Sequence, residues 1–217
     1  MKVKLVSITK PLVEGLNSAE ELVAYCARVS NPSNQLNNET APKLLRYLVK
    51  NKHWSPYEMV SACFEIVTSR AIAAQILRHR SFSFQEFSQR YAVATQLEDI
   101  QWRLQGKTNR QVGDTETVLS DELKNKVDLA LKSASDAYEG LVADGVAKEC
   151  ARMVLPLTTQ TTLYMNGTLR SWIHYLDLRT SEHTQKEHRE IAIEIQKVLF
   201  KEFPNVAESL MKISDTY

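Results

Sequence analysis

The sequence predicts a mixed fold in which strands and helices alternate within one domain. Three strand-like stretches, at residues 1–9, 53–69 and 157–165, are separated by segments with helical periodicity. The chain has 217 residues, which is long enough to bury one large core, and it contains no repeat and no obvious linker. We therefore expect residues 1–217 to form a single domain.

The first third of the chain predicts two helices followed by a turn and a strand. Ser18, with Glu21 three positions later, forms a capping box that opens a helix. Another helix is expected at 39–51, where a proline falls in the first turn. Ser55-Pro56 then predicts a turn, and the β-branched and aromatic run that follows it is typical of a buried strand.

Residues 69–88 change their periodicity in the middle. The first part, 69–79, carries an apolar stripe at helical spacing. The helix face beside this stripe holds three polar side chains: Gln75, Arg78 and His79. Residues 81–88 alternate serine and phenylalanine, which favours extended chain, so Ser88 and Arg90 are expected to point the same way.

The second half of the chain predicts a long loop followed mainly by helices. Residues 96–120 are polar with weak periodicity, which indicates a long loop or surface insertion. Helices are then expected at four places: about 121–143, a short one ending before Pro156, 168–180, and about 184–212 with a break at Pro204.

Charge and cysteine content restrict the classes of partner. The 27 basic and 26 acidic side chains give a net charge of +1, so we expect no nucleic acid and no membrane as partner. Cys26, Cys63 and Cys150 are odd in number and far apart, as in a reducing compartment. The charged N-terminal stretch does not resemble a signal peptide, and we expect a soluble, cytoplasmic protein.

The segment RHRSFSFQEFSQRY, residues 78–91, gathers donors for an anion. A helix that ends in Arg-His-Arg and a chain that returns with Ser88 and Arg90 could bring guanidinium groups together from two sides. Guanidinium forks suit phosphate or carboxylate, because paired N–H groups bind two oxygens at once. The alternative is that these arginines are solvated or paired with nearby acidic side chains, and the residues alone leave both interpretations open.

Other kinds of site find little support in the sequence. His53 could act as an acid or base or contact a flavin edge, although a single histidine is more often an ordinary hydrogen-bonded residue. His183 and His188 are five positions apart, which misaligns them on a helix, and we predict no metal site. No nucleophile motif, no G-x-G-x-x-G and no P-loop is present.

Four blocks in order resemble the flavin-dependent thymidylate synthases. The first signature is Arg-His-Arg at 78–80 and, after seven intervening residues, Ser88, followed by Arg90. HWSPYE at 53–58 resembles the family's His-x-[Ser/Thr]-Pro-[Phe/Tyr]-Glu stretch. ECARMVLP at 149–156 and LRSWIHYLDLRT at 169–180 resemble its two later blocks, so the likeness covers nearly the whole chain.

The resemblance implies a fold, an assembly and a reaction. It implies an α+β fold with a twisted, mainly antiparallel sheet flanked by helices, in a homotetramer whose active sites lie between subunits. The implied reaction transfers a one-carbon unit from 5,10-methylenetetrahydrofolate to C5 of dUMP and reduces it with a hydride from FADH2. NADPH first reduces the FAD, and no enzyme cysteine is required.

The resemblance also implies roles for individual residues. The FAD contacts would be Ser55, Arg78, His79, Arg80, Glu86, Arg170 and His174, and the dUMP contacts would be Gln75, Arg78, Glu86, Ser88, Arg90, Arg152 and Arg179. Arg179 would be the catalytic residue, placed on the pyrimidine carbonyl to stabilise charge as the base is activated. His53 and Gln85 are further candidates.

The chain departs from the family pattern at three positions. Many members carry Asn in place of Gln85, Thr168 and His174, and the version here resembles the subgroup of large DNA viruses and some cyanobacteria. Two alternatives are a dCMP or dUMP hydroxymethylase on the same scaffold, and a phosphate or nucleic-acid binding module without catalysis.

Overall fold

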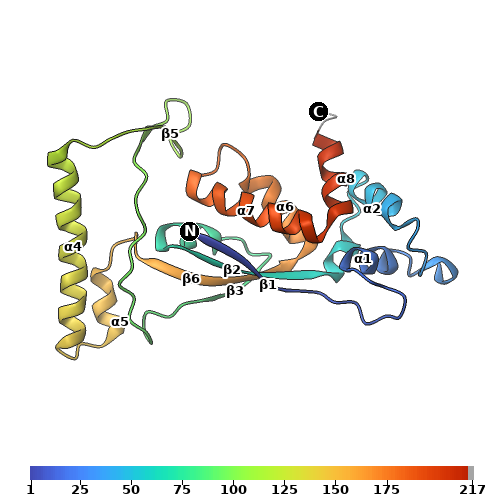
Figure 1. Cartoon of the computed structure of the whole chain (residues 1–217), viewed down its shortest axis with the longest axis horizontal. Helices are drawn as coiled ribbons and strands as arrows, with labels where there is room; N and C mark the ends of the chain where they lie inside the picture. Colours follow the sequence, from blue (N-terminus) through green and yellow to red (C-terminus); the bar gives the residue numbers. More distant parts are fainter. Residues whose placement is uncertain (215–217) are drawn as a thin grey trace.

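A four-stranded antiparallel sheet forms the centre of the fold. The computed structural model describes residues 1–214, with side chains to residue 211. The sheet has the order β1-β2-β6-β3, and its strands are β1 (Lys2–Ile8), β2 (Ser61–Ser69), β6 (Gln160–Thr168) and β3 (Ser83–Glu86). Helices lie on one side of this sheet and at both of its ends (Figure 1). The α+β fold with a mainly antiparallel sheet is therefore confirmed.

The helices follow the capping and proline signals of the sequence. Their bounds are α1 (Ala19–Ala27), α2 (Ala41–Lys50), α3 (Arg70–Ile76), α4 (Asp121–Ala143), α5 (Lys148–Ala151), α6 (Leu169–Arg179), α7 (Lys186–Glu202) and α8 (Pro204–Ser214). Three short 3-10 turns are η1 (Pro32–Asn34), η2 (Ser55–Met59) and η3 (Arg152–Val154). The capping box of Ser18 and Glu21 opens α1, and Pro204 separates α7 from α8, as the sequence predicts.

Alternation along β2 decides which face of the sheet is buried. Ala62, Phe64, Ile66 and Thr68 are buried, while the residues between them are only half-buried. The helices α6 and α7 cover the buried face (Figure 1). Trp172 of α6 is fully buried there, with its ring centroid 5.0 Å from that of Phe64. The tilted edge-to-face contact is a favourable aromatic geometry and anchors α6 on the sheet.

Gly167 near the end of β6 allows the segment after α3 to pass close to the sheet. A Cβ atom at this position would lie 2.4 Å from the ring of Phe82. Phe82 is buried and also packs against Trp172, with ring centroids 4.7 Å apart. Since no larger residue fits, the glycine sets how near residues 78–82 approach the start of α6.

The long helix α4 stands apart from the sheet. It lies at one end of the molecule beside α5 (Figure 1). Of its 23 residues only Tyr138 is buried. Among the described residues, no helix has both the length and the apolar character needed to cross a bilayer.

Two details of the sequence prediction were wrong. Residues 96–120 are not a loop throughout, because they contain a short hairpin of β4 (Arg103–Gln105) and β5 (Gly113–Glu116). The extended stretch at 81–88 is shorter than expected, since β3 ends at Glu86. Ser88 accepts backbone hydrogen bonds in a turn that includes Arg90, so the two residues are not strand neighbours.

Candidate active site

The C-terminal ends of α3 and α6 meet because of how these helices leave the sheet. β2 continues directly into α3 at Ser69, and β6 continues into α6 at Thr168. The hydroxyl of each residue accepts a backbone hydrogen bond from the first turn of its helix and caps it. Since β2 and β6 are antiparallel, the two helices start at opposite ends of the strand pair. Their last residues then come together below α7.

Arg179 and His79 form the contact at this meeting point. Arg179 Nε donates to His79 Nε2 over 2.9 Å. Burial and the Arg179 charge lower the pKa of His79 to about 4, so the imidazole is neutral at pH 7 and can accept this hydrogen bond. Among the described residues, the two terminal nitrogens of Arg179 have no partner. The guanidinium is thus held by Nε, and its outer N–H groups remain available to a ligand.

Gln75, Tyr175 and His188 lie beside this pair. Together with His79 and Arg179 they form what we call the core network. His188 is fully buried, and its Nδ1 lies 3.4 Å from Gln75 Oε1 while its Nε2 lies 3.1 Å from the Tyr175 hydroxyl. Burial, together with the charge of Arg179 and the nearby His79, lowers the pKa of His188 to about 3. The network therefore contains two imidazoles that are neutral at pH 7.

Arg78 and Arg80 follow α3 and lie at the surface. Both side chains are exposed, and neither forms an ion pair with another described residue. For Arg78 and Arg80 this excludes the pairing with neighbouring carboxylates, whereas their exposure fits the interpretation in which they are solvated. Two unpaired guanidinium groups flank His79 and could bind an anionic ligand.

Ser88 and Arg90 line a separate, open pocket, the Ser88–Arg90 pocket. It has a volume of about 320 Å³ and also includes Tyr91, Lys148 and Glu149. Arg90 Nη2 and Nε each lie 3.2 Å from Glu149 Oε2, and both side chains remain more than half exposed. Arg152 begins η3 and is half-buried, with no side-chain partner among the described residues. An anion that binds Arg90 here must compete with Glu149.

A third set of candidate residues lies between η2 and α6. The His174 ring packs edge-on against Trp54, with centroids 5.1 Å apart, and Arg170 forms an ion pair with Glu58. Burial and the Arg170 charge lower the pKa of His174, although Asp177 opposes this shift. Trp54 and His174 line a groove of about 540 Å³, the Trp54–His174 groove, which α2, α7 and α8 close on the other sides.

The remaining candidates have simpler surroundings. His53 is exposed and packs edge-on against Tyr47, and Ser55 is exposed at the start of η2. Gln85 is exposed on β3, directly across from Tyr164 of β6. Glu86 is engaged within the subunit, since Oε1 accepts from Arg70 at 2.8 Å and from the Thr161 hydroxyl at 2.9 Å.

The candidate residues thus fall into three groups within one chain. Gln75, His79 and Arg179 share the core network, Ser88 and Arg90 share the pocket by α5, and His174 and Arg170 lie near η2. Sequence reasoning missed Tyr175 and treated His188 only as an unlikely metal ligand. In the described part of the chain no group of three His, Cys, Asp or Glu side chains could hold a metal ion.

Comparison with known proteins gives a consistent result. A family model described as thymidylate synthase complementing protein matches residues 11–205. A probable flavin-dependent thymidylate synthase of Paramecium bursaria Chlorella virus 1 is 50% identical over 214 residues, covering 97% of this chain and 99% of that protein. A flavin-dependent thymidylate synthase of Synechocystis is 49% identical over 215 residues, with coverage of 97% and 99%.

A solved structure is similar in fold along almost the whole chain. The UMP/dUMP methylase PolB from Streptomyces cacaoi, bound with 5-Br dUMP, matches with a TM-score of 0.79 and 26% sequence identity. The match covers 97% of this chain and 94% of that chain. The similarity therefore includes the sheet, α4 and the helices that carry the three groups.

Proposed function

The chain belongs to the family of thymidylate synthase complementing proteins, the flavin-dependent thymidylate synthases, and we propose that it converts dUMP to dTMP by reductive methylation. It is a methyltransferase. The observation that carries the proposal is the hydrogen bond from Arg179 to His79. The family resemblance assigns Arg179 to the pyrimidine and the Arg-His-Arg segment to the flavin. This hydrogen bond therefore connects the two proposed ligand sites.

The chain's own donors fit FAD. Arg78 and Arg80 are exposed and lack a partner among the described residues, and guanidinium groups suit the two phosphates of FAD. The Trp54–His174 groove offers aromatic and apolar walls with Lys50 and Lys52 at its rim. We assign Ser55, Arg78, His79, Arg80, Glu86, Arg170 and His174 to FAD binding. When bound, FAD supplies the hydride that reduces the transferred one-carbon unit, with 5,10-methylenetetrahydrofolate as carbon donor and NADPH as reductant.

The nucleotide is assigned to the other two groups. Ser88, Arg90, Arg152 and Gln75 hold the phosphate and sugar of dUMP, with Arg78 and Glu86 nearby. Charge-assisted N–H donors are what a phosphate dianion requires. In the Ser88–Arg90 pocket the phosphate replaces the Glu149 carboxylate as the partner of Arg90.

Arg179 stabilises the pyrimidine as it gathers negative charge. Its terminal N–H groups are directed by the anchor at Nε, so little reorganisation is needed when charge develops on a carbonyl oxygen of the base. Neutral His79 accepts the Nε–H and does not place a second cation beside the guanidinium. Burial also raises the pKa of Tyr175, so the phenol beneath these residues stays protonated.

The separate placement of the Ser88–Arg90 pocket supports active sites shared between subunits. This pocket is formed by residues 88–91 and 147–149, whereas α6 and α7 carry both the core network and walls of the Trp54–His174 groove. A homotetramer, with each site built from more than one subunit, accounts for this separation. The long exposed helix α4 offers a surface for such contacts.

Product analysis tests the proposal. The purified protein, loaded with FAD, is incubated with 5,10-methylenetetrahydrofolate, NADPH and either dUMP or dCMP, and the nucleotide product is identified by mass. Formation of dTMP and a flavin spectrum that NADPH bleaches are the expected results. A hydroxymethylated dUMP or dCMP, with dTMP absent, would instead identify a hydroxymethylase. A colourless protein that takes up no FAD and binds RNA would remove the enzyme class.

A further inference from the structure

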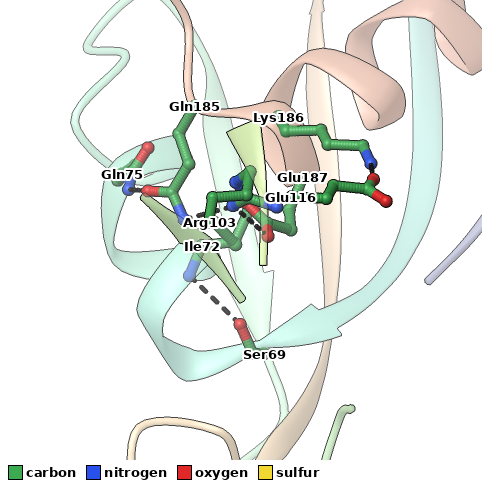
Figure 2. Close-up of polar contacts among 8 residues, drawn as sticks. All are labelled: Ser69, Ile72, Gln75, Arg103, Glu116, Gln185, Lys186 and Glu187. Carbon is green, nitrogen blue, oxygen red and sulfur yellow. Dashed lines mark hydrogen bonds and ion pairs between the residues drawn. The ribbon is translucent and has the colours of Figure 1, made fainter. Parts of the chain in front are cut away.

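A chain of hydrogen bonds connects the β4–β5 hairpin to Gln75 (Figure 2). Arg103 of β4 donates to Glu187 Oε1 over 2.5 Å, and Gln185 Nε2 donates to Glu187 Oε2 over 2.9 Å. Gln75 Nε2 in turn donates to Gln185 Oε1 over 2.6 Å. The side chains of Arg103 and Glu187 are only 12% and 20% exposed, so water competes weakly for these bonds.

The ionised carboxylate of Glu187 decides the direction of every bond in this chain. A carboxylate can only accept, so Gln185 must turn its NH2 group toward Glu187 and its carbonyl toward Gln75. Gln75 must then turn its own NH2 group toward Gln185. Its carbonyl is left facing His188, which must donate from Nδ1 and accept the Tyr175 hydroxyl proton at Nε2.

Glu187 is ionised under ordinary conditions. Burial alone would raise the pKa of Glu187, but hydrogen bonds from Arg103, from its own backbone N–H and from Gln185 lower it further than burial raises it. A second ion pair holds the same hairpin, since Lys186 Nζ lies 2.6 Å from Glu116 Oε1 of β5 (Figure 2). The hairpin therefore fixes both charged residues that begin α7.

We propose that Glu187 is a positioning residue. It fixes the Gln75 amide so that one N–H of the NH2 group donates to Gln185, and the second N–H, not the carbonyl, is available to the nucleotide. The inference rests on the proposed role of Gln75 in binding dUMP. The phosphate and ribose oxygens that Gln75 would meet need donors, and a flipped amide would place a carbonyl oxygen against them. Arg103 keeps Glu187 in place, which gives residues 96–120 a role in substrate binding.

The first test reverses the polarity while keeping the shape. In Glu187→Gln the carbonyl at 187 is taken by Arg103, so the NH2 group faces Gln185. Gln185 must then turn its carbonyl toward 187 and its NH2 group toward Gln75, which favours the opposite orientation of the Gln75 amide. Loss of one hydrogen bond that serves a charged ligand is expected to raise the KM for dUMP about tenfold. Because Gln75 contacts parts of dUMP that do not react, kcat should change by less than about threefold.

The second test restores the polarity with different residues. In the double variant Glu187→Gln with Gln185→Glu, the carboxylate at 185 accepts directly from Gln75, while the amide at 187 donates to 185 and accepts from Arg103. The KM for dUMP should return to within about threefold of the wild-type value. The matched control is Glu182→Gln, which changes an exposed carboxylate of the preceding loop and should leave both constants as they are.

Each outcome decides the proposal. A Glu187→Gln variant with wild-type KM, or one whose kcat falls while KM is unchanged, overturns it. A double variant as impaired as Glu187→Gln also overturns it, because the effect would then come from loss of the Arg103 ion pair and not from amide polarity. If the wild-type protein itself makes no dTMP from dUMP, the proposed function fails, and this is visible before any variant is measured.

Discussion

The core network and the Ser88–Arg90 pocket prepare for a ligand in opposite ways. In the core network His188 is fully buried and Tyr175 is 2% exposed, and hydrogen bonds orient both imidazoles, the phenol and Nε of Arg179. In the pocket Arg90 and Glu149 are 66% and 54% exposed and hold each other in an ion pair. The first region is oriented before substrate arrives, whereas the second must exchange a protein carboxylate for a phosphate.

The difference suggests where catalytic rate and where affinity are determined. Groups that stabilise charge in a transition state work best when they do not have to reorganise, which suits the core network. Groups that bind a phosphate far from the reacting carbon contribute to substrate affinity and can remain in contact with water until it binds. Variants in the two regions should therefore change different kinetic constants.

The largest effect is expected at Arg179. Arg179→Ala removes a preoriented cation from the pyrimidine, and kcat should fall about 10³-fold. The flavin content of the purified variant should stay close to that of the wild type. By contrast, Arg78→Ala should empty the flavin site, and absorbance of the purified proteins measures both.

Arg179→Lys serves as the control for charge without the guanidinium geometry. It should recover only part of the activity, since lysine cannot donate to His79 and to a ligand through one planar group. Equal flavin content in Arg179→Ala and Arg78→Ala would contradict the assignment of Arg78 to flavin binding and of Arg179 to the pyrimidine.

Arg90→Ala should give the next largest effect, on a different constant. Loss of a charge-assisted contact to phosphate is expected to raise the KM for dUMP about 30-fold while kcat changes little. Steady-state kinetics over a range of dUMP concentrations measures the two constants. Arg110, exposed in the β4–β5 turn region, supplies the control as Arg110→Ala. A fall in kcat at constant KM would contradict the inference that the pocket determines substrate affinity and the core network determines the catalytic rate.

Acid should destabilise the folded protein through the core network. The pKa values of His79 and His188 are lowered to about 4 and about 3, whereas an unfolded histidine titrates near pH 6.5. As the pH falls below about 6.5, the unfolded chain binds protons that the folded chain refuses, so the free energy of unfolding falls.

His188→Gln should reduce this dependence on pH. Removing one such histidine lowers the slope of the unfolding free energy by up to about 1.4 kcal/mol per pH unit near pH 5. Urea unfolding at constant protein concentration between pH 4.5 and 7 measures the slope, with the exposed His183→Gln as surface control. Identical slopes for His188→Gln and the wild type would show that His188 is not held neutral by its surroundings.

The smallest effect is expected at Glu149. Glu149→Gln frees Arg90 from its carboxylate partner, and an exposed ion pair contributes less than about 1 kcal/mol. The KM for dUMP should therefore fall, by about two- to fourfold. An increase in KM would mean that Glu149 assists nucleotide binding instead of competing with the phosphate.

Local signals in the sequence predicted most of the fold. Ser18 with Glu21, the proline at 204 and the β-branched and aromatic run after Ser55-Pro56 are short-range patterns, and each has the expected element in the structure. The β4–β5 hairpin was missed because its strands are three and four residues long, and contacts with α7 hold it in place. Tertiary contacts of this kind leave no periodicity in the sequence.

The sequence predicted individual candidate residues better than it predicted which of them are in contact. The spacing of residues 78–90 singled out the donors, but nothing in it indicated that His79 would meet Arg179 while Arg90 would pair with Glu149. His188 was hidden because burial, not spacing, makes it part of the network. The orientation of Gln75 depends on Glu187, 112 positions away in the chain, so no local pattern could predict it.

The close fit of Gly167 against Phe82 restricts the order in which this protein can change. Any side chain at 167 would overlap the Phe82 ring, so a substitution there becomes tolerable only after Phe82 has been replaced by a smaller residue. Replacing Phe82 first would leave a cavity beside Trp172, which is also costly. Positions 82 and 167 must therefore change together or not at all. Directed evolution that samples one substitution at a time should yield active variants in which both Phe82 and Gly167 are retained.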